Sequence, residues 1–298
     1  MSTAELHTEP LHPLFGARVR GVDLSAPLDA ASLAALRAAL DEHSVLLFPD
    51  QRLQAGDQVR FSEAFGPLEA AITAQSASGP GRHLAFLSNV DEAGAIVPPD
   101  DRKQLFHAAN RLWHTDSTFK PQPALASLLY ALEVPRTGGE TELVSTRVAW
   151  RELAAERQRA IAPLWAVHDF QRSRDLVAPG LVDAAVQRML PPVARPLVRT
   201  NPRNGERALY IASHAVSIEG MGVAQSRRLL DELLDWCTRE HCVYRHRWSA
   251  GDLLMWDNRC TMHRGRPWDA HVERRVMTRS TVIDTGYDDE PEIRARAA

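Results

Sequence analysis

The segment Trp113-His-Thr-Asp116 places an imidazole and a carboxylate two residues apart. In an extended segment, successive side chains point to opposite faces, so His114 and Asp116 share a face and can bind one metal ion. A third ligand must come from elsewhere in the chain, and we expect it to be His263, which follows an apolar run. Two histidines and one carboxylate leave three octahedral positions open, which is typical of non-haem iron(II) oxygenases. The alternative is a surface histidine beside an aspartate that caps a turn.

Two further segments could bind carboxylates. If Arg275-Val-Met-Thr-Arg279 is a strand, Arg275 and Arg279 lie on one face, where two guanidinium groups could bind two acidic groups. The alternative is the solvated outer face of an edge strand, where arginines are common. Gly138-Gly-Glu-Thr141 is a turn that opens a strand, and the Thr141 hydroxyl could add a hydrogen bond to a bound carboxylate. Taken alone, this segment is only a turn.

The elements that must position these residues are short strands and helices. Several short strands with turn residues between them favour a sandwich or barrel decorated by helices. The arginine-rich residues 170–195 are weakly patterned and predict no element. No linker divides the chain, so we expect a single domain over residues 1–298. The periodicity predicts helices over 29–43, 57–65, 145–161 and 224–240, and strands over 44–48, 84–87, 126–134, 207–212, 243–248, 252–257 and 275–283.

Residues 70–110 differ from the rest of the chain because turn residues dominate them. Ser76-Ala-Ser-Gly-Pro-Gly81 and Val97-Pro-Pro-Asp-Asp101 flank one short strand candidate. So irregular a segment inside a compact domain is either a disordered insertion or a functional lid. Because it leads directly into the segment with His114, we favour an active-site lid.

Composition excludes several classes of function. The formal net charge of −3 does not suit a polyanion binder, so we expect no nucleic-acid partner. The three cysteines match no zinc-ligand spacing and disfavour a disulfide-built secreted fold. The N-terminal residues lack the pattern of a signal peptide, and no apolar run is long enough to span a bilayer. We therefore expect a cytoplasmic protein without a membrane partner.

Together, these motifs resemble the taurine dioxygenase family of Fe(II)/2-oxoglutarate oxygenases, and within it the branch that degrades chlorinated phenoxyacetate herbicides. The matching segments keep the family's order over nearly the whole chain, so the combination is far more specific than any one of them. They are residues 11–15 with 21–24, Phe65-Gly-Pro-Leu-Glu69, Leu112-Trp-His-Thr-Asp-Ser-Thr-Phe119, Gly138-Gly-Glu-Thr141, Tyr244-Arg-His-Arg-Trp248, and residues 251–260 running on to His263-Arg-Gly265.

The resemblance implies a mainly β fold with flanking helices around a double-stranded β-helix, the jelly-roll or cupin-like core. It also implies Fe(II), with 2-oxoglutarate and O2 as co-substrates, and commonly a homo-oligomer. By this resemblance His114, Asp116 and His263 bind iron, Arg275 and Thr141 hold the distal carboxylate of 2-oxoglutarate with Asn110 near it, Arg279 meets the acidic group of the main substrate, and His214, Ile72 and Trp113 belong to the substrate site. A structural role for His214 is an equal alternative.

The expected reaction hydroxylates the carbon next to the ether oxygen of an aryloxyalkanoic acid, a small carboxylic acid. It releases a phenol and a 2-oxo acid such as glyoxylate, together with succinate and CO2. Ala70-Ala-Ile-Thr73 stands where the taurine enzyme has a sulfonate-binding histidine, and only Lys103 stands where the phenoxyacetate branch has several lysines. Two alternatives stay open: oxygenation of an alkyl sulfonate or sulfate ester on the same scaffold, and a metal-binding jelly-roll sensor of a small acid.

Overall fold

The computed structural model describes residues 6–70, 79–98 and 100–293. Its helices are α1 (Ala30–His43), α2 (Ala55–Glu63), α3 (Arg102–Ala108), α4 (Thr146–Arg151), α5 (Ala155–Ile161), α6 (Phe170–Asp175), α7 (Ala184–Met189) and α8 (Val223–Cys237). Its strands are β1 (His7–Pro10), β2 (Ala17–Arg20), β3 (Val45–Phe48), β4 (Ala85–Ser88), β5 (Ala124–Glu133), β6 (Thr141–Ser145), β7 (Trp165–His168), β8 (Val193–Pro196), β9 (Val198–Thr200), β10 (Arg207–Leu209), β11 (Ala215–Ile218), β12 (Tyr244–His246), β13 (Leu253–Asp257), β14 (Thr261–Gly265) and β15 (Val276–Ile283). No described helix is both long enough and apolar enough to cross a bilayer.

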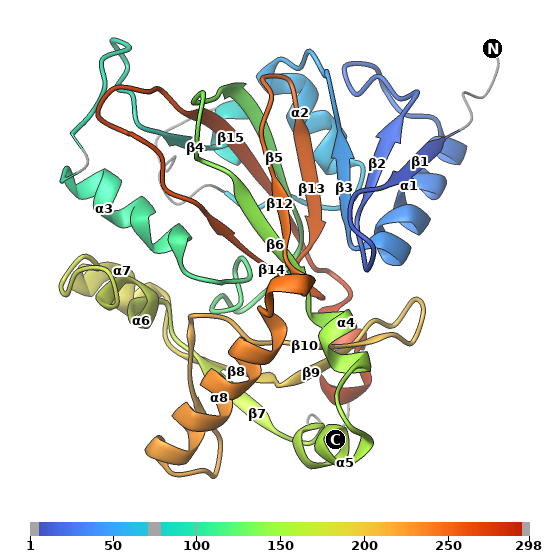
Figure 1. Ribbon diagram of the computed structural model, residues 1–298, viewed down its shortest axis with the longest axis vertical. Helices are drawn as coiled ribbons and strands as arrows, with labels where there is room; N and C mark the ends of the chain where they lie inside the picture. Colours follow the sequence, from blue (N-terminus) through green and yellow to red (C-terminus); the bar gives the residue numbers. More distant parts are fainter. Residues whose placement is uncertain (1–5, 71–78, 99, 294–298) are drawn as a thin grey trace.

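A large sheet in the order β1-β2-β3-β13-β5-β15-β4 dominates the described residues (Figure 1). All its pairings are antiparallel except that between β2 and β3. Both faces of its central strands are covered: in β13, Leu253 and Met255 enter one core cluster and Leu254 and Trp256 enter another. Alternate side chains of a strand point to opposite faces of the sheet. Because both faces are buried at β13, its sequence is a continuous run of apolar residues.

Helices α1 and α2 cover one face of this sheet (Figure 1). Leu36 and Leu40 of α1 and Phe61 of α2 pack into the same cluster as the inner side chains of β3, β5 and β13. Asp29 caps the N-terminus of α1, because its carboxylate accepts a hydrogen bond from the Ser32 amide.

The other face of the large sheet packs against the small sheet β12-β6-β14. Leu143 of β6 shares a buried cluster with Leu129, Leu254 and Met277 of the large sheet. The two antiparallel sheets therefore enclose a common core in a jelly-roll arrangement, and the mainly β fold with flanking helices is confirmed.

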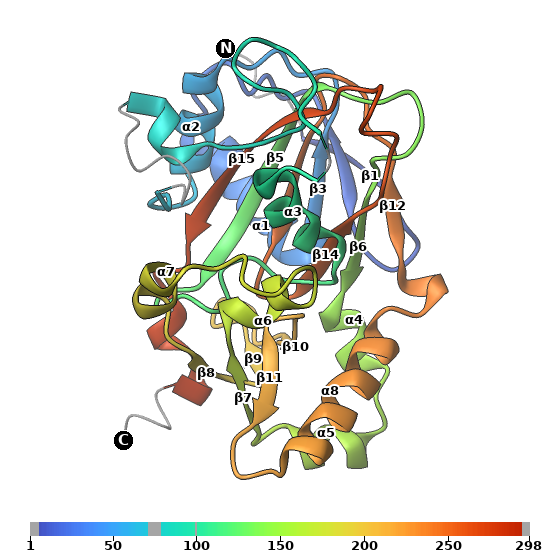
Figure 2. The same ribbon diagram turned by 90° about the vertical axis from the view of Figure 1, so that its left-hand side faces the viewer.

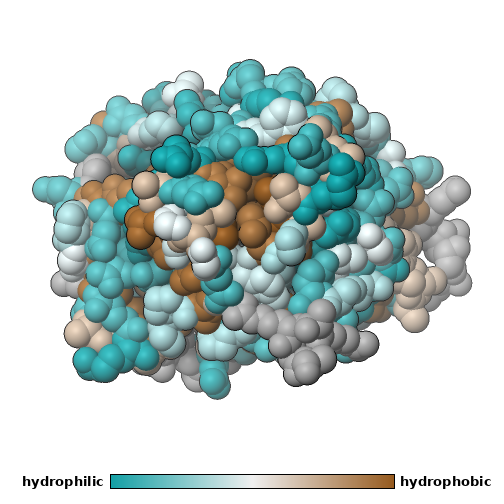
Figure 3. All heavy atoms as spheres, turned by 90° about the horizontal axis from the view of Figure 1, so that it is seen from below, coloured by the Kyte–Doolittle hydropathy of each residue, from teal (hydrophilic) through white to brown (hydrophobic). Residues whose placement is uncertain are grey.

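A second core lies at the opposite end of the molecule, where β7, β8 and β11 form a sheet beneath α4 and α8. There α8 buries Leu229, Leu230 and Leu233, as its amphipathic pattern predicts. In two perpendicular views, α3 lies directly above α6 (Figures 1 and 2), and the ring centroids of Phe106 and Phe170 are 6.0 Å apart. Viewed from below, apolar side chains reach the surface in a band surrounded by hydrophilic residues (Figure 3).

The single helix expected over 145–161 is wrong, because α4 and α5 are separate helices. The chain leaves the helix after Arg151 and re-enters a helix at Ala155, and the Gln158 side chain donates to the Trp150 carbonyl across this break. The weakly patterned residues 170–195 contain α6, α7 and most of β8. Phe170 and Val182 anchor this region against Phe119, a contact that no local pattern predicts.

Candidate active site

Three side chains meet where β14 approaches the segment before β5. His114 and His263 form an isolated antiparallel bridge, in which each backbone amide donates to the other residue's carbonyl at 3.0 and 2.8 Å. The bridge holds the two rings on one side, with centroids 4.1 Å apart. Asp116 Oδ1 lies 3.9 Å from His114 Nε2, and its Oδ2 lies 3.7 Å from His263 Nε2. Each of the three residues offers a ligand atom, all within 4.8 Å of one another, so this donor set fits one divalent metal ion.

The Asp116 carboxylate accepts one hydrogen bond at each of its two oxygens. Ser127 Oγ donates to Oδ2 at 2.7 Å, and Arg279 donates to Oδ1 at 2.8 Å. Asn258 supports this arrangement, because its side-chain amide donates to Ser127 Oγ and its carbonyl oxygen accepts from the Trp256 indole. Such outer partners fix the orientation of a metal-binding carboxylate before any metal binds.

The protonation states of these groups suit metal binding. Burial lowers the pKa of both His114 and His263 below the usual histidine value, despite the opposing effect of Asp116. Burial alone would raise the pKa of Asp116, but the charge of Arg279 and the hydrogen bond from Ser127 hold it well below its usual range. His114 Nδ1 lies 2.8 Å from the Leu112 carbonyl, so Nδ1 carries the proton and Nε2 is free to bind a metal. Neutral imidazoles and an ionised carboxylate are the forms that ligate metals.

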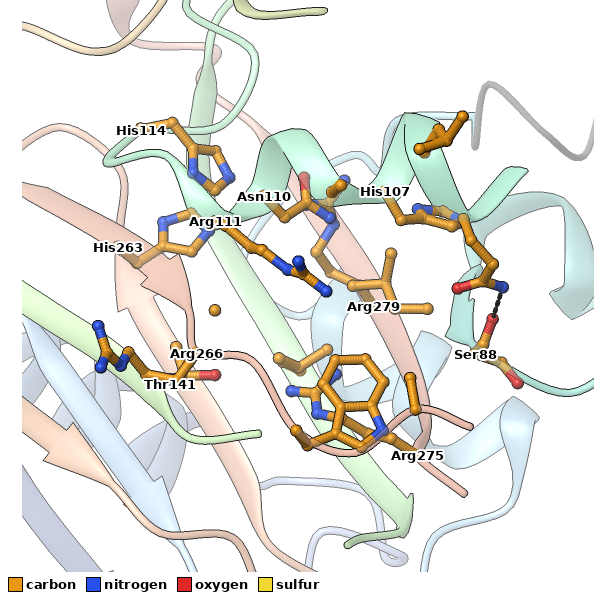
Figure 4. A pocket seen from close by; sticks show the side chains of 18 of the residues that line it. Ser88, His107, Asn110, Arg111, His114, Thr141, His263, Arg266, Arg275 and Arg279 are labelled. Carbon is orange, nitrogen blue, oxygen red and sulfur yellow. Dashed lines mark hydrogen bonds between the residues drawn. The ribbon is translucent and has the colours of Figure 1, made fainter. Parts of the chain in front are cut away.

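A cavity of about 190 Å³ opens from the two histidines toward Arg275 (Figure 4). His114 and His263 lie side by side at one end, and Arg275 lies on the opposite side of the cavity. Arg275 precedes β15 and Thr141 begins β6, so the two sheets each supply one group to this cavity, which we call the first cavity. Asn110 also lines it.

Arg275 and Thr141 are arranged to receive an acidic group. The Arg275 side chain is buried and donates from Nε to the Gly139 carbonyl at 3.2 Å, but no ion pair links it to any described carboxylate. Burial lowers its pKa to about 10, which still leaves it charged at neutral pH. The Thr141 hydroxyl accepts a hydrogen bond from the Trp248 indole at 3.1 Å, so its own hydrogen can be donated to a ligand.

Gly139 lets the Arg275 side chain pass this close to the turn. Its φ is +71°, and an added Cβ would lie 2.9 Å from Pro135 Cγ and 3.3 Å from Arg275 Cδ and Nε. Glycine therefore meets two needs here, a left-handed backbone and space for the arginine.

A second cavity of about 90 Å³ adjoins the first on the other side of His114. Arg279 and Asn110 line both cavities, so the segment Arg275–Arg279 reaches both, as the predicted strand face implies. The other walls of this second cavity are mainly aromatic and basic. They include Phe106, Phe119, Phe170, Arg174, His214 and the ion pair of Glu69 with Lys120.

Three predicted substrate residues have different positions. His214 lines the second cavity, where its Nδ1 lies 3.5 Å from Thr118 Oγ1, and burial lowers its pKa well below the usual value. Trp113 lines neither cavity: the residue before His114 points to the other side of the segment and packs into the second core, under the Arg264 guanidinium. The expectation that Trp113 contacts substrate is therefore not supported by its position. Ile72 lies outside the described residues.

Several residues of the second cavity were missed in the sequence. Phe119 stands in the His-x-Asp segment, so its proximity to the site could have been inferred. Phe170 and Arg174 are spaced i and i+4, which places them on one face of a helix. Only the fold, however, shows that this face turns toward His114, because α6 packs against Phe119, which is distant in sequence.

Comparisons with known proteins agree with this geometry. Residues 7–281 match the family described as "Taurine catabolism dioxygenase TauD, TfdA family". The chain is 41% identical to the alpha-ketoglutarate-dependent 2,4-dichlorophenoxyacetate dioxygenase of Cupriavidus pinatubonensis, covering 92% of this chain and 96% of the relative. It is 35% identical to the (S)-phenoxypropionate/alpha-ketoglutarate-dioxygenase of Sphingobium herbicidovorans, covering 92% and 93%. The crystal structure of AAD-2 in complex with Mn(II) and N-oxalylglycine superposes with a TM-score of 0.87 at 36% identity, covering 94% and 97%.

Proposed function

The chain belongs to the TauD/TfdA family and is a 2-oxoglutarate-dependent dioxygenase, and from this premise we propose that it oxidises aryloxyalkanoic acids. The observation that carries the proposal is the pair of adjoining cavities at His114. One cavity ends in a buried, unpaired arginine suited to the co-substrate, and the other offers aromatic side chains beside a guanidinium. An aromatic ring with a short acidic side chain matches the second cavity, and the two relatives named above act on such acids.

We propose that His114, Asp116 and His263 hold the metal ion, Fe(II). Their converging donor atoms and their protonation states support this assignment. Ser127 and Arg279 each donate to one carboxylate oxygen of Asp116 and so keep the group aimed at the metal position.

We also propose that Arg275 and Thr141 bind the far carboxylate of 2-oxoglutarate, and that Asn110 forms part of the same wall. A charge-assisted pair at a buried guanidinium contributes about 1.5–3 kcal/mol. Because Arg275 lies across the first cavity from the histidines, this pair would direct the keto-acid end of the molecule toward the metal ligands.

When bound, Fe(II) with 2-oxoglutarate and O2 supplies the oxidising power, and the oxygen atoms end in succinate and in the new substrate hydroxyl while CO2 is released. The residues of this chain then have to position the substrate. Arg279 would bind its acidic group, which places the adjacent carbon beside the metal ligands that share this wall. Hydroxylation of a carbon that bears an aryloxy group gives a hemiacetal, which collapses to a phenol and a 2-oxo acid such as glyoxylate.

The lid role of residues 70–110 remains a prediction. Of this segment, residues 79–98 and 100–110 are described, and Leu87, Gln104 and His107 from them line the first cavity. Closure over these cavities would exclude water, which protects the protein from uncoupled oxidation. The homo-oligomeric state also remains a prediction, which light scattering after size-exclusion chromatography would test.

The function is tested with a panel of aryloxyalkanoic acids, alkyl sulfonates and alkyl sulfate esters, scored by succinate formation with Fe(II), ascorbate and 2-oxoglutarate. We expect 2,4-dichlorophenoxyacetate to give succinate, 2,4-dichlorophenol and glyoxylate in equal amounts. Sulfite or sulfate release without phenol would instead favour the sulfonate or sulfate-ester alternative.

A further inference from the structure

Arg174 of α6 carries a guanidinium that pairs with no carboxylate among the described residues. It lines the second cavity, and its Nε is buried without a hydrogen-bond partner among the described residues. Its Cζ lies 4.4 Å from the ring centroid of Phe106 and 5.0 Å from that of Phe170. The two rings hold the guanidinium in place, but they leave its hydrogen-bond donors unused.

Arg279 lies in the same wall of the second cavity and also has a buried hydrogen-bond donor without a described partner. One of its terminal nitrogens donates to Asp116 Oδ1 at 2.8 Å, while its Nε is buried and has no partner in the described part of the chain. Two guanidinium groups therefore face one cavity, each with at least one unused buried donor. Burial, and then the charge of Arg279, lower the pKa of Arg174 to about 10, which leaves it charged at neutral pH.

The acidic groups near this cavity form no ion pair with Arg174. Glu69 accepts from Lys120 Nζ at 2.5 Å and from Ser117 Oγ at 3.0 Å, both through Oε2, while its Oε1 is buried without a hydrogen-bond partner among the described residues. Asp116 accepts from Ser127 and Arg279. A bound anion placed between Arg174 and Arg279 would supply acceptors to both guanidinium groups.

A buried arginine with a purely structural role is treated differently in this chain. Arg199, in β9, is fully buried and donates to Asp284 at 2.6 Å and to both carboxylate oxygens of Glu290. Two acidic residues thus surround a single guanidinium there. Unlike Arg199, Arg174 forms no ion pair with a described carboxylate, and its position in the wall of the second cavity makes it available to a bound anion.

We propose that Arg174 is a second substrate-binding residue, which together with Arg279 binds the carboxylate of the aryloxyalkanoic acid between α6 and β15. This assignment rests on the proposed function and adds a specificity residue to the same site. The acid would then be held from two sides, by β15 of the jelly-roll core and by α6, which packs against Phe119. Substrates whose acidic group cannot reach both guanidinium groups would bind less tightly.

The test measures equilibrium binding to protein loaded with Mn(II) and N-oxalylglycine, by isothermal titration calorimetry. The ligands are 2,4-dichlorophenoxyacetate and its uncharged primary amide. R174Q should weaken binding of the acid about tenfold or more, because a charge-assisted hydrogen bond is lost. Binding of the amide should change by less than about twofold. R172Q is the matched control: Arg172 lies in the same helix and lines neither cavity, so both ligands should bind as to wild type.

Kinetics with Fe(II) and 2-oxoglutarate give an independent readout. R174Q should raise the KM for the acid and leave the KM for 2-oxoglutarate unchanged, and R174K should recover part of the lost affinity because it keeps the charge. If R174Q loses affinity equally for the acid and for the amide, Arg174 has a packing role and the proposal is overturned. If R174Q does not fold, the same comparison is made with R174K. Unchanged affinity for the acid would overturn the proposal as well. If the wild-type protein neither binds nor oxidises the acid, the proposed function itself is refuted. That result is distinct from a failure of the Arg174 proposal alone.

Discussion

The two cavities that meet at His114 are built from different parts of the fold. In the first, the groups that we assign to the co-substrate carboxylate lie on strands or next to them, Thr141 on one sheet and Arg275 on the other. The second takes its aromatic and basic side chains largely from helices, Phe106 from α3 and Arg174 from α6. Arg279 and His114 are common to both.

This difference in construction corresponds to two functions: binding of the metal and co-substrate in the first cavity, and selection of the substrate in the second. Hydrogen-bonded ladders and a shared apolar core fix the strands of the first cavity, so the groups for metal and co-substrate are held rigidly. The helices of the second cavity belong to less regular segments that can change in length and sequence without disturbing the sheets. We therefore expect substitutions in the first cavity to affect the common chemistry, and those in the second to affect the choice of substrate.

The largest effect is expected where the two cavities meet. His114→Ala should lower succinate formation more than about hundredfold with every substrate, since loss of even an outer-shell partner commonly costs 10- to 100-fold in metal affinity or activity. Iron content after reconstitution should fall in parallel, as measured by a colorimetric iron assay. His241→Ala, which removes an exposed histidine, should retain both. Full iron content in the His114 variant would contradict its role as a ligand.

A smaller and more selective effect is expected at the far end of the first cavity. Arg275→Ala should raise the KM for 2-oxoglutarate about ten- to hundredfold, because a buried charge-assisted pair is lost. Iron binding should persist, because this residue is remote from the metal ligands. Arg274→Ala is the control, since that neighbouring side chain is exposed and pairs with Glu133. An unchanged KM for 2-oxoglutarate in the Arg275 variant would show that Arg275 does not bind the co-substrate. It would also weaken the distinction between the two cavities.

The smallest effect concerns how that arginine is positioned. Gly139→Ala should raise the KM for 2-oxoglutarate several-fold and lower the melting temperature, because the new Cβ would crowd Pro135 and Arg275. Gly205→Ala is a matched control: Gly205 has a φ of +72°, close to the +71° of Gly139, but nothing lies within 4 Å of an added Cβ. Both variants carry the same backbone strain of about 1–2 kcal/mol. If both change the KM equally, the contact with Arg275 is irrelevant.

Much of the β core could be predicted because its signals are local. The apolar runs of β3, β5 and β13 depend on residues near in sequence, and these elements appear close to the expected bounds. The helical residues of the 170–195 region could not be predicted, because their apolar side chains are few and become buried only against Phe119. The break between α4 and α5 was not predicted either, because the expected periodicity continues across it.

For the site, the sequence by itself determined the types of ligand: a histidine and an aspartate two residues apart, a later histidine, and two arginines four residues apart. These follow from side-chain chemistry and from the alternation of an extended chain. The three-dimensional fold is needed to show that Trp113 packs into a core, that Arg279 bonds to Asp116, and that the Nε of Arg174 has no hydrogen-bond partner among the described residues. The physical reason is that a guanidinium binds a ligand or has a structural role according to which acidic residues the fold brings near it. The local sequence does not indicate how far the guanidinium lies from those acidic residues.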